Sequence, residues 1–295
     1  MANTIEYAKV FQTELDKQIV QQSTSGWMED NAKQYLYNGG AEIKIPKLEM
    51  QGLTDYDRAE GYTSGAVTFG YETFRMSMDR SRRFRLDSMD VDETNFVLSA
   101  ANVMSEFQRT RVIPEIDAYR YSKLAAAAAI TGTYTAASST ILSKLMGDIN
   151  KVQDVTGSDD LVVTISREVY GLLATNDKLA YHITANNFTQ GKIDMTIKTL
   201  DGIPLIPVPS ARMKSEYTFN SDGDGGFTPT ADAKSINWII CPRTAPVGVS
   251  KTDNVKIITP ELNQFADAWD IDYRKYHDMF VPDNKKAAIA VSFSG

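Results

Sequence analysis

Apolar and polar residues alternate with a period close to two in two early segments of the chain, residues 41–50 and 67–78. This alternation predicts two extended strands, although Pro46 keeps the first out of the centre of a sheet. Residues 51–65, between them, are rich in glycine and charge and predict a connecting tip. Two strands alone are marginally stable in water, so a long ribbon needs support from another surface. We therefore expect this ribbon to leave its own domain and lie most economically on a second copy of the chain.

A helical spacing of three and four precedes the ribbon. The apolar residues that carry it are Ile5, Ala8, Phe11, Leu15 and Ile19. They predict an amphipathic helix, which residues 21–26 end, and a mobile connection then leads to a turn at residues 38–40. The helix could be an ordinary surface helix or an arm that docks on a neighbouring subunit. We favour the arm, because nothing adjacent in the sequence offers its apolar face a partner.

A long helix is predicted after the ribbon. Asp90 and Glu93 resemble a capping box, and an apolar stripe follows at helical spacing. A helix over residues 92–129 would be about 57 Å long. Pro114 removes one ladder hydrogen bond and clashes one turn back, so we expect a bend or break near residues 112–113 and a hinge at Pro114. The alanine run 125–129 predicts a buried helix end.

Short elements alternate beyond Gly132. A helix begins near Ile141 and ends at Gly157, and Ser166 can cap a second helix over residues 167–176. Expected strands lie at residues 161–165, 193–200, 236–241 and 254–259, with an edge-like segment at Pro204, Pro207 and Pro209 and a final hairpin that pairs 270–281 with 287–293. Strands interspersed with helices indicate an α+β fold with mixed, largely antiparallel sheets.

Composition and charge narrow the class of protein. The chain has 295 residues, of which 42% are hydrophobic and 23% charged, as is ordinary for a folded soluble protein. A net charge of −7 argues against a protein that wraps nucleic acid with its whole surface. One cysteine excludes an internal disulfide framework and fits a reducing compartment. The amino terminus lacks the order of a signal peptide, and no apolar run could span a bilayer, so we expect an intracellular product without a membrane partner.

The candidate chemistry is weak. Asn220, Asp222 and Asp224 match the first half of a calcium loop, but Ala231 stands where its bidentate Glu should be, so we expect a hairpin tip at residues 222–226. His182 and His277 lie far apart in the sequence, and we expect a structural role for each. Cys241 ends an apolar strand, which suits a buried thiol better than a nucleophile. No catalytic, phosphate-binding or zinc motif is present, so we expect no enzyme, no cofactor and no metal site.

Five arginines within eleven residues form the strongest charge feature: Arg75, Arg80, Arg82, Arg83 and Arg85. Such a run fits a nucleic-acid patch, a solvated face or contacts between subunits. We favour subunit contacts, with acidic partners on other subunits supplied by the 55–60 tip and by Asp87, Asp90 and Asp92. The subunit-interface candidates are Asp55, Asp57, Arg58, Arg80, Arg82, Arg83 and Arg85.

Several of these stretches, taken in order, resemble the major capsid proteins of tailed bacteriophages, which have the Hong Kong 97-type capsid fold. The similar stretches are residues 52–58 with Gly61-Tyr62, Arg82–Asp87, 90–94, Pro114–Arg120, 201–207 and Tyr276-His277-Asp278. The resemblance implies an N-terminal arm (residues 1–40), an extended E-loop (41–80) and a spine helix (about 90–130). It also implies a peripheral domain (81–134 and 251–295, including the spine helix) and an axial domain (135–250).

The resemblance further implies a structural function. Such a protein self-assembles, as pentamers and hexamers, into an icosahedral shell that encloses double-stranded DNA without sequence-specific binding, and it is part of the virion after assembly in the bacterial cytoplasm. About forty residues precede the E-loop, which favours a separate scaffolding protein, beside portal and head-completion proteins. No lysine lies between Lys47 and Lys123, so the loop tip cannot supply the lysine that one relative cross-links, and we expect non-covalent locking. An encapsulin-type nanocompartment, which encloses enzymes, is the alternative.

Overall fold

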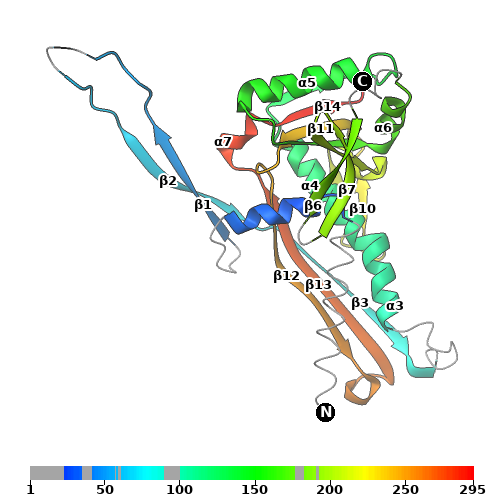
Figure 1. Cartoon of the computed structure of the whole chain (residues 1–295). Helices are drawn as coiled ribbons and strands as arrows, with labels where there is room; N and C mark the ends of the chain where they lie inside the picture. The colour runs from blue at the N-terminus through cyan, green and yellow to red at the C-terminus, as the bar shows by residue number, and fades with distance from the viewer. Residues whose placement is uncertain are drawn as a thin grey trace.

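The computed structural model describes residues 23–34, 42–56, 58, 61–89, 100–176, 183–190 and 193–295, with the backbone alone for 100, 101, 183–190, 193–197 and 252. The expected amphipathic helix at residues 5–19, the capping pair at 90 and 93, His182 and the interface candidate Asp57 lie outside the described residues. Within them, a body built on a seven-stranded sheet continues into a narrow three-stranded sheet, and a two-stranded hairpin projects from the junction between the two (Figure 1).

The seven-stranded sheet forms the body. Its strands, in spatial order, are β4 (Ile130–Thr133), β14 (Ala290–Phe293), β11 (Ile236–Pro242), β5 (Leu161–Ser166), β8 (Ile203–Val208), β7 (Ile193–Leu200) and β6 (Ile183–Gln190). Two helices, α5 (Ile141–Thr156) and α6 (Arg167–Ala174), pack on it through buried aliphatic side chains. As predicted, α5 ends at Gly157 in the left-handed region, with φ +60°, and the Ser166 hydroxyl caps α6 by accepting from the Val169 N–H.

Two predictions about this sheet are wrong. The final segment does not pair with β13 in a hairpin: β14 lies between β4 and β11, since the short helix α7 (Asp283–Lys286) carries the chain from one sheet to the other. β8 is an interior strand and not an edge. Its prolines are tolerated because β7 pairs only with Ile203 and Pro204, whereas β5 pairs from Leu205 onwards, so neither neighbour covers the whole strand. β4 and β14, which fall within the residue ranges of the expected peripheral domain, belong to this seven-stranded sheet. The division into domains stays a prediction.

The three-stranded sheet has the order β12 (Val247–Ile258), β13 (Ala268–Phe280) and β3 (Met78–Asp87), all antiparallel. A long helical segment packs along it: α3 (Ala100–Phe107), the π-helical turn η2 (Gln108–Val112) and α4 (Ile113–Ala126). Phe107 meets Phe84 and Tyr273 edge to face, with ring centroids 4.8 and 5.9 Å apart. The sequence did not predict β3, because its arginines concealed the alternation that ends in Phe84 and Leu86.

The hairpin consists of β1 (Glu42–Met50) and β2 (Val67–Arg75), which pair over their whole length as the sequence predicted. Before it lies the 3-10 helix η1 (Gly26–Gln34), whose Trp27 and Met28 are buried in the main core. The expectation of a mobile connection over residues 21–40 is therefore wrong for the described part, 23–34. A smaller hairpin, β9 (Tyr217–Phe219) with β10 (Phe227–Pro229), stands beside α4, and two further 3-10 turns, η4 (Ser210–Arg212) and η5 (Pro260–Leu262), complete the described elements. None of the helices in this part of the chain is long and apolar enough to cross a membrane.

Candidate subunit-interface surfaces

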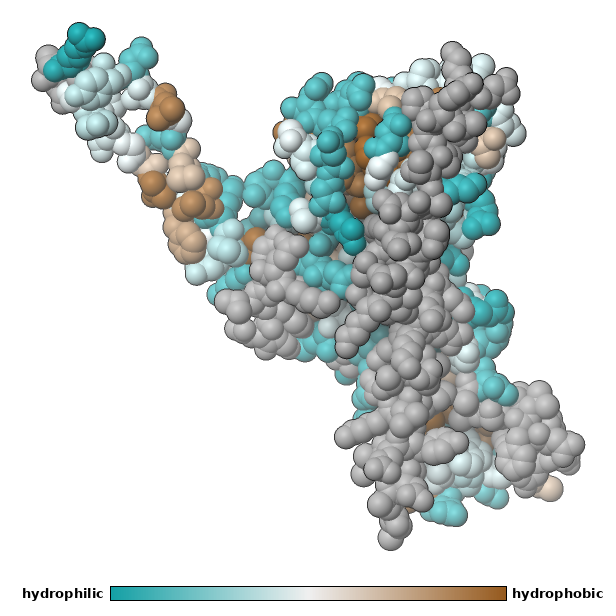
Figure 2. Space-filling model, in the orientation of Figure 1, coloured by the Kyte–Doolittle hydropathy of each residue, from teal (hydrophilic) through white to brown (hydrophobic). Residues whose placement is uncertain are grey.

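The outer half of the β1–β2 hairpin carries an apolar face that is open to solvent. The register pairs Leu48 with Phe69, Met50 with Val67 and Pro46 with Tyr71, so all six side chains point to the same side of the ribbon. Leu48 is 55% exposed, Phe69 59% and Met50 69%, and Figure 2 shows the brown patch along the projecting ribbon. A contiguous apolar patch of this kind marks an interaction site rather than a stable free surface.

The base of the same hairpin uses its opposite face. Ile43 and Ile45 are buried, 1% and 4% exposed, and pack with Met76, Val247 and Phe280. Because successive side chains in a strand point to opposite faces, these odd-numbered residues of β1 lie opposite to the exposed, even-numbered Leu48 and Met50. The apolar side of the ribbon therefore changes face beyond Ile45. Its exposed half points away from the surface that covers its base, and the described part of this chain leaves it uncovered.

A buried carboxylate fixes the root of the hairpin. Asp278, on β13, is fully buried and accepts from the Ser77 N–H at 2.8 Å and the Ser77 hydroxyl at 3.0 Å, at the point where β2 passes into β3. It also accepts from the Tyr119 hydroxyl at 2.7 Å and from the Lys123 ammonium, both on α4. Burial raises the pKa of Tyr119 well above its usual range, so the phenol stays a donor. The hairpin thus leaves the body from a junction tied to both β13 and α4.

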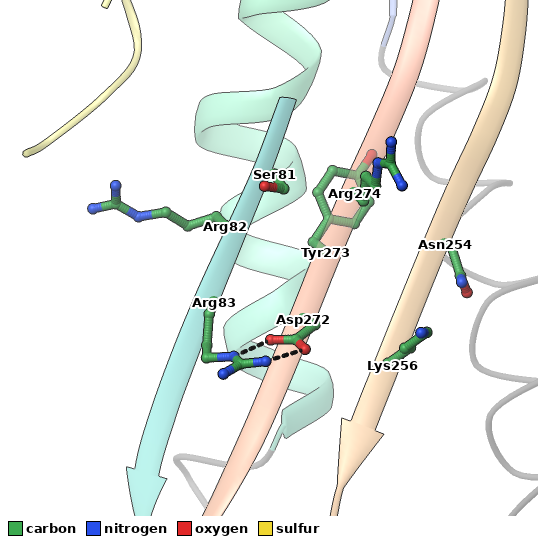
Figure 3. A pocket seen from close by; sticks show the side chains of 8 residues that line it. All are labelled: Ser81, Arg82, Arg83, Asn254, Lys256, Asp272, Tyr273 and Arg274. Carbon is green, nitrogen blue, oxygen red and sulfur yellow. Dashed lines mark hydrogen bonds and ion pairs between the residues drawn. The ribbon is translucent and has the colours of Figure 1, made fainter. Parts of the chain in front are cut away.

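The arginines of β3 pair within their own chain. Arg83 forms a bidentate ion pair with Asp272 and Arg85 with Asp270, both across the strand on β13, at Nε–Oδ1 distances of 2.5 and 2.7 Å. The hydrogen bonds from Arg83 and Arg85 lower the pKa values of Asp272 and Asp270. Figure 3 shows the Arg83–Asp272 pair beside an open cavity of about 500 Å³ on this face of the sheet. The carboxylate partners of Arg83 and Arg85 were expected on other subunits, but the structure places them in the same chain, on β13. The reason is that directly opposed residues of paired strands lie closest to each other.

Arg80 and Arg82 point to the other side of β3, toward the helices. Arg80 forms an ion pair with Glu115 of α4 at 2.8 Å, and both it and Arg82 donate to backbone carbonyls at the tip of the β9–β10 hairpin. The tip at residues 222–226 is a glycine-rich turn, as predicted. Of the remaining candidates, Asp55 and Arg58 lie exposed in the connection between β1 and β2. The interface role of all these residues stays a prediction.

Pro114 stands at the start of α4, directly after the π-helical turn. The Ile113 N–H donates to the carbonyl of Gln108, five residues back, and the Thr110 hydroxyl donates to the carbonyl of Glu106 at 2.7 Å. The helix therefore passes through the predicted site of disturbance as a π turn, which displaces the carbonyl that the proline ring would meet. Whether this point acts as a hinge stays a prediction.

A second buried carboxylate, which the sequence did not single out, holds the N-terminal strap, residues 23–34. Asp117 of α4 accepts from the hydroxyls of Ser23 and Ser25 at 2.8 and 2.6 Å, from Thr24 and from the Arg212 guanidinium at 2.9 Å. Beside it Arg120, 1% exposed, donates to Glu29 at 2.5 Å. The sequence signal that could have identified this site is a charged residue, Asp117 or Arg120, at a core-facing position of a predicted helix.

Cys241 and His277 are both buried side chains. Cys241 is buried, and burial raises the pKa of its thiol to about 12, which confirms the expectation of an inert thiol. His277 is buried beside Tyr119, and burial together with nearby cations lowers the pKa of its imidazole well below the usual value. Among the described residues, no group of three or more His, Cys, Asp or Glu side chains could hold a metal ion.

Comparisons with known proteins complete the description. No family model and no curated protein sequence matches the chain. Among solved structures, a chain from Mycobacterium phage Che8 is similar, with a TM-score of 0.59, 15% identity, and coverage of 86% of this chain and 84% of that one. A chain of the bacteriophage PhiM1 mature capsid is similar with a TM-score of 0.58 and 12% identity, over 88% of this chain and 83% of that one. The virus-like particle from Pyrococcus furiosus is similar with a TM-score of 0.50 and 10% identity, over 90% of this chain and 96% of that one.

Proposed function

We propose that this chain, which has the Hong Kong 97-type capsid fold that the sequence predicted, is a major capsid protein of a tailed bacteriophage. Its proposed function is to self-assemble, as pentamers and hexamers, into an icosahedral shell that encloses double-stranded DNA. The similar structures support the fold, since they cover most of this chain at low identity. The function is our inference from the surfaces that the fold leaves open.

The projecting β1–β2 hairpin carries this proposal. Its outer apolar face is more than half exposed at each of the five large side chains that form it: Leu48, Met50, Val67, Phe69 and Tyr71. A two-stranded ribbon is marginally stable alone, so it gains stability when that face is covered. A second copy is the economical cover, because one surface repeated on every subunit then joins many copies. Asp55, Asp57 and Arg58 at its tip are proposed to add polar contacts with the neighbour.

The other partners follow from the same proposal. A separate scaffolding protein would guide assembly, and portal and head-completion proteins would occupy special positions in the shell. The enclosed DNA would meet the shell without sequence-specific contacts, because the chain has a net charge of −7 and its β3 arginines already have partners in the chain. Assembly would take place in the bacterial cytoplasm, and the mature location is the virion.

Assembly of the purified chain tests the proposal. With its scaffold supplied, the chain should form closed shells in electron micrographs. The double variant Leu48→Ser/Phe69→Ser should fold with a free energy of unfolding within about 0.5 kcal/mol of the unsubstituted chain, because both side chains are exposed, and should fail to assemble. The variant Glu49→Ser/Thr68→Ala changes the paired residues on the opposite face at the next register position, and should assemble normally. A chain that stays monomeric at high concentration, or a double variant with normal shell yield, would contradict the proposal.

A nanocompartment that encloses proteins is the second candidate. The similarity to the Pyrococcus furiosus virus-like particle, of which 96% is covered, supports it. The lower TM-score of that comparison favours the phage capsid. The contents of native particles decide between the two: double-stranded DNA supports the capsid, and a uniform protein cargo supports the nanocompartment.

A further inference from the structure

The β9–β10 hairpin contacts both the seven-stranded and the three-stranded sheet and belongs to neither. Its strands pair only with each other, over three residue pairs. Two contacts tie its base to the seven-stranded sheet. Lys214 forms a β-bridge with Ser235, directly before β11, and the N–H of Ile236, the first residue of β11, donates to the carbonyl of Met213. Its tip reaches β3 of the three-stranded sheet. This tip contact can open without breaking a strand ladder of either sheet.

Two arginines of β3 make the tip contact, which we call the β3–hairpin contact. Arg80 donates through Nη1 to the carbonyl of Asn220 at 2.9 Å and through Nη2 to that of Gly226 at 3.2 Å, while its Nε donates to Glu115 at 2.8 Å. Arg82 donates through Nη1 to the carbonyl of Gly223 at 2.7 Å. One guanidinium thus joins β3, the first turn of α4 and the hairpin tip, and a second extends the contact along the tip.

The backbone of the tip is shaped for these donors. Gly223, Gly225 and Gly226 have φ values of +36°, +65° and +77°, a region that other residues rarely adopt. At this turn the planar guanidinium of Arg80 donates to two carbonyls at once, those of Asn220 and Gly226, through a fixed fork that an ammonium group does not have. Below the tip, Phe219 meets Tyr119 of α4 edge to face, with centroids 5.5 Å apart. The contact lies directly after Pro114 and the π turn, where the helix departs from regular geometry.

We propose that Arg80 and Arg82 are positioning residues that hold the seven-stranded sheet at a fixed orientation to the three-stranded sheet and the β1–β2 hairpin. In a shell, which rests on the proposed function above, the angle between these two parts sets the angle between neighbouring subunits and hence the curvature. Loosening the contact would let one subunit adopt several orientations, so one population of chains would build particles of several sizes.

The test combines hydrogen–deuterium exchange of the subunit with particle sizes. The variant Arg80→Met/Arg82→Met keeps side chains of similar length without donors. We expect amide hydrogens of residues 217–229 to exchange at least tenfold faster, and particles to fall into more than one size class. Arg274→Met is the matched control on the neighbouring strand β13, because Arg274 pairs with Asp79 of β3 inside the three-stranded sheet, and it should leave both measurements unchanged.

Single variants keep the test decisive if the double variant does not fold. Arg82→Met removes only an exposed contact and should speed exchange at the tip, whereas Arg82→Lys retains a donor for one carbonyl and should restore much of the protection. Unchanged exchange in Arg82→Met and Arg80→Met, or particles of a single normal size despite faster exchange, would overturn the proposal. If the unsubstituted chain formed no shells, the proposed function would fail, while the exchange data would still show whether the contact exists.

Discussion

At the scale of single residues, two buried carboxylates fix the N-terminal strap and the root of the β1–β2 hairpin on the body. Asp117 holds the N-terminal strap at residues 23–25, and Asp278 holds Ser77 at the root of the hairpin. Both are fully buried and both receive several donors, including a cation on α4 or η4. Burial makes such a carboxylate costly unless it is paired, so these residues stabilise one arrangement of strap, hairpin and helix against others.

Asp117→Ala should therefore be strongly destabilising. It leaves the Arg212 guanidinium and five backbone or hydroxyl donors of the strap without this acceptor, so we expect the free energy of unfolding to fall by about 3–5 kcal/mol. Asp272→Ala is the matched control, because its pair with Arg83 is exposed and should be worth about 0.2–1 kcal/mol. Urea unfolding of both variants measures the difference, and similar losses in the two would contradict this account of the strap.

His277 should make stability depend on pH. Burial lowers the pKa of its imidazole, with contributions from the cations Arg120, Lys275, Lys123 and Arg80, and the Tyr119 ring meets it edge to face. The unfolded chain has the ordinary pKa near 6.5 and binds a proton that the folded chain does not. Hence the free energy of unfolding is highest above pH ~6.5 and should fall by up to ~1.4 kcal/mol per pH unit as the pH decreases below it.

Urea unfolding of His277→Phe between about pH 5 and 7 measures this contribution. Carboxylates with lowered pKa values, such as Asp270 and Asp272, lose their pairs only at lower pH, below about 4, so this window isolates the imidazole. The slope should flatten in the variant. An equal slope in the two proteins would mean that His277 does not titrate differently on unfolding.

At the scale of elements, signals that depend on nearby residues predicted the structure correctly, whereas the pairing of the last strand with distant strands was predicted wrongly. Gly157, Ser166 and the β1–β2 alternation depend on neighbours in the sequence, and the structure confirms each. The partner of the last strand depends on which sheet it enters, and β14 enters the seven-stranded sheet between β4 and β11. Of the candidate site, the sequence predicted the ribbon, but not its change of apolar face or the in-chain partners of the arginines, since both require the three-dimensional register.

Pro114→Ala tests the π turn as a bending point of the helix. The substitution supplies a backbone N–H and removes the ring that clashes with the preceding turn, so a regular α-helix becomes available across residues 108–114. The family resemblance implies a compact precursor shell that expands when DNA enters. We expect the isolated subunit to be no less stable, whereas precursor shells should form poorly or expand abnormally.

Cryo-electron microscopy of precursor and mature particles tests directly whether the helix bends at Pro114. The axis of the helix across residues 112–117 should differ between the two states in the unsubstituted protein. An unchanged axis would rule out the hinge and leave Pro114 as the residue that only begins α4.

At the scale of the whole molecule, the described residues form a seven-stranded and a three-stranded sheet, connected through the α3–η2–α4 segment and through α7. The β1–β2 hairpin projects from them, and the described residues leave its outer apolar face uncovered. The resemblance in the sequence and the similar structures agree on this architecture, although identity to those structures is only 10–15%. Such agreement reflects the spacing of elements more than the identity of single residues, which explains why the fold was predictable and the partners of individual side chains were not.

The net charge of the whole molecule predicts a low affinity for DNA. A shell protein must enclose DNA without holding it tightly, and a net charge of −7 repels phosphate at long range. Three of the five arginines of the run, Arg80, Arg83 and Arg85, form ion pairs with Glu115, Asp272 and Asp270. We therefore expect the isolated subunit to show no DNA binding at about 150 mM salt in a mobility-shift assay. An affinity that falls steeply with salt, and that is lost in Arg83→Met/Arg85→Met, would instead identify this strand as a nucleic-acid surface.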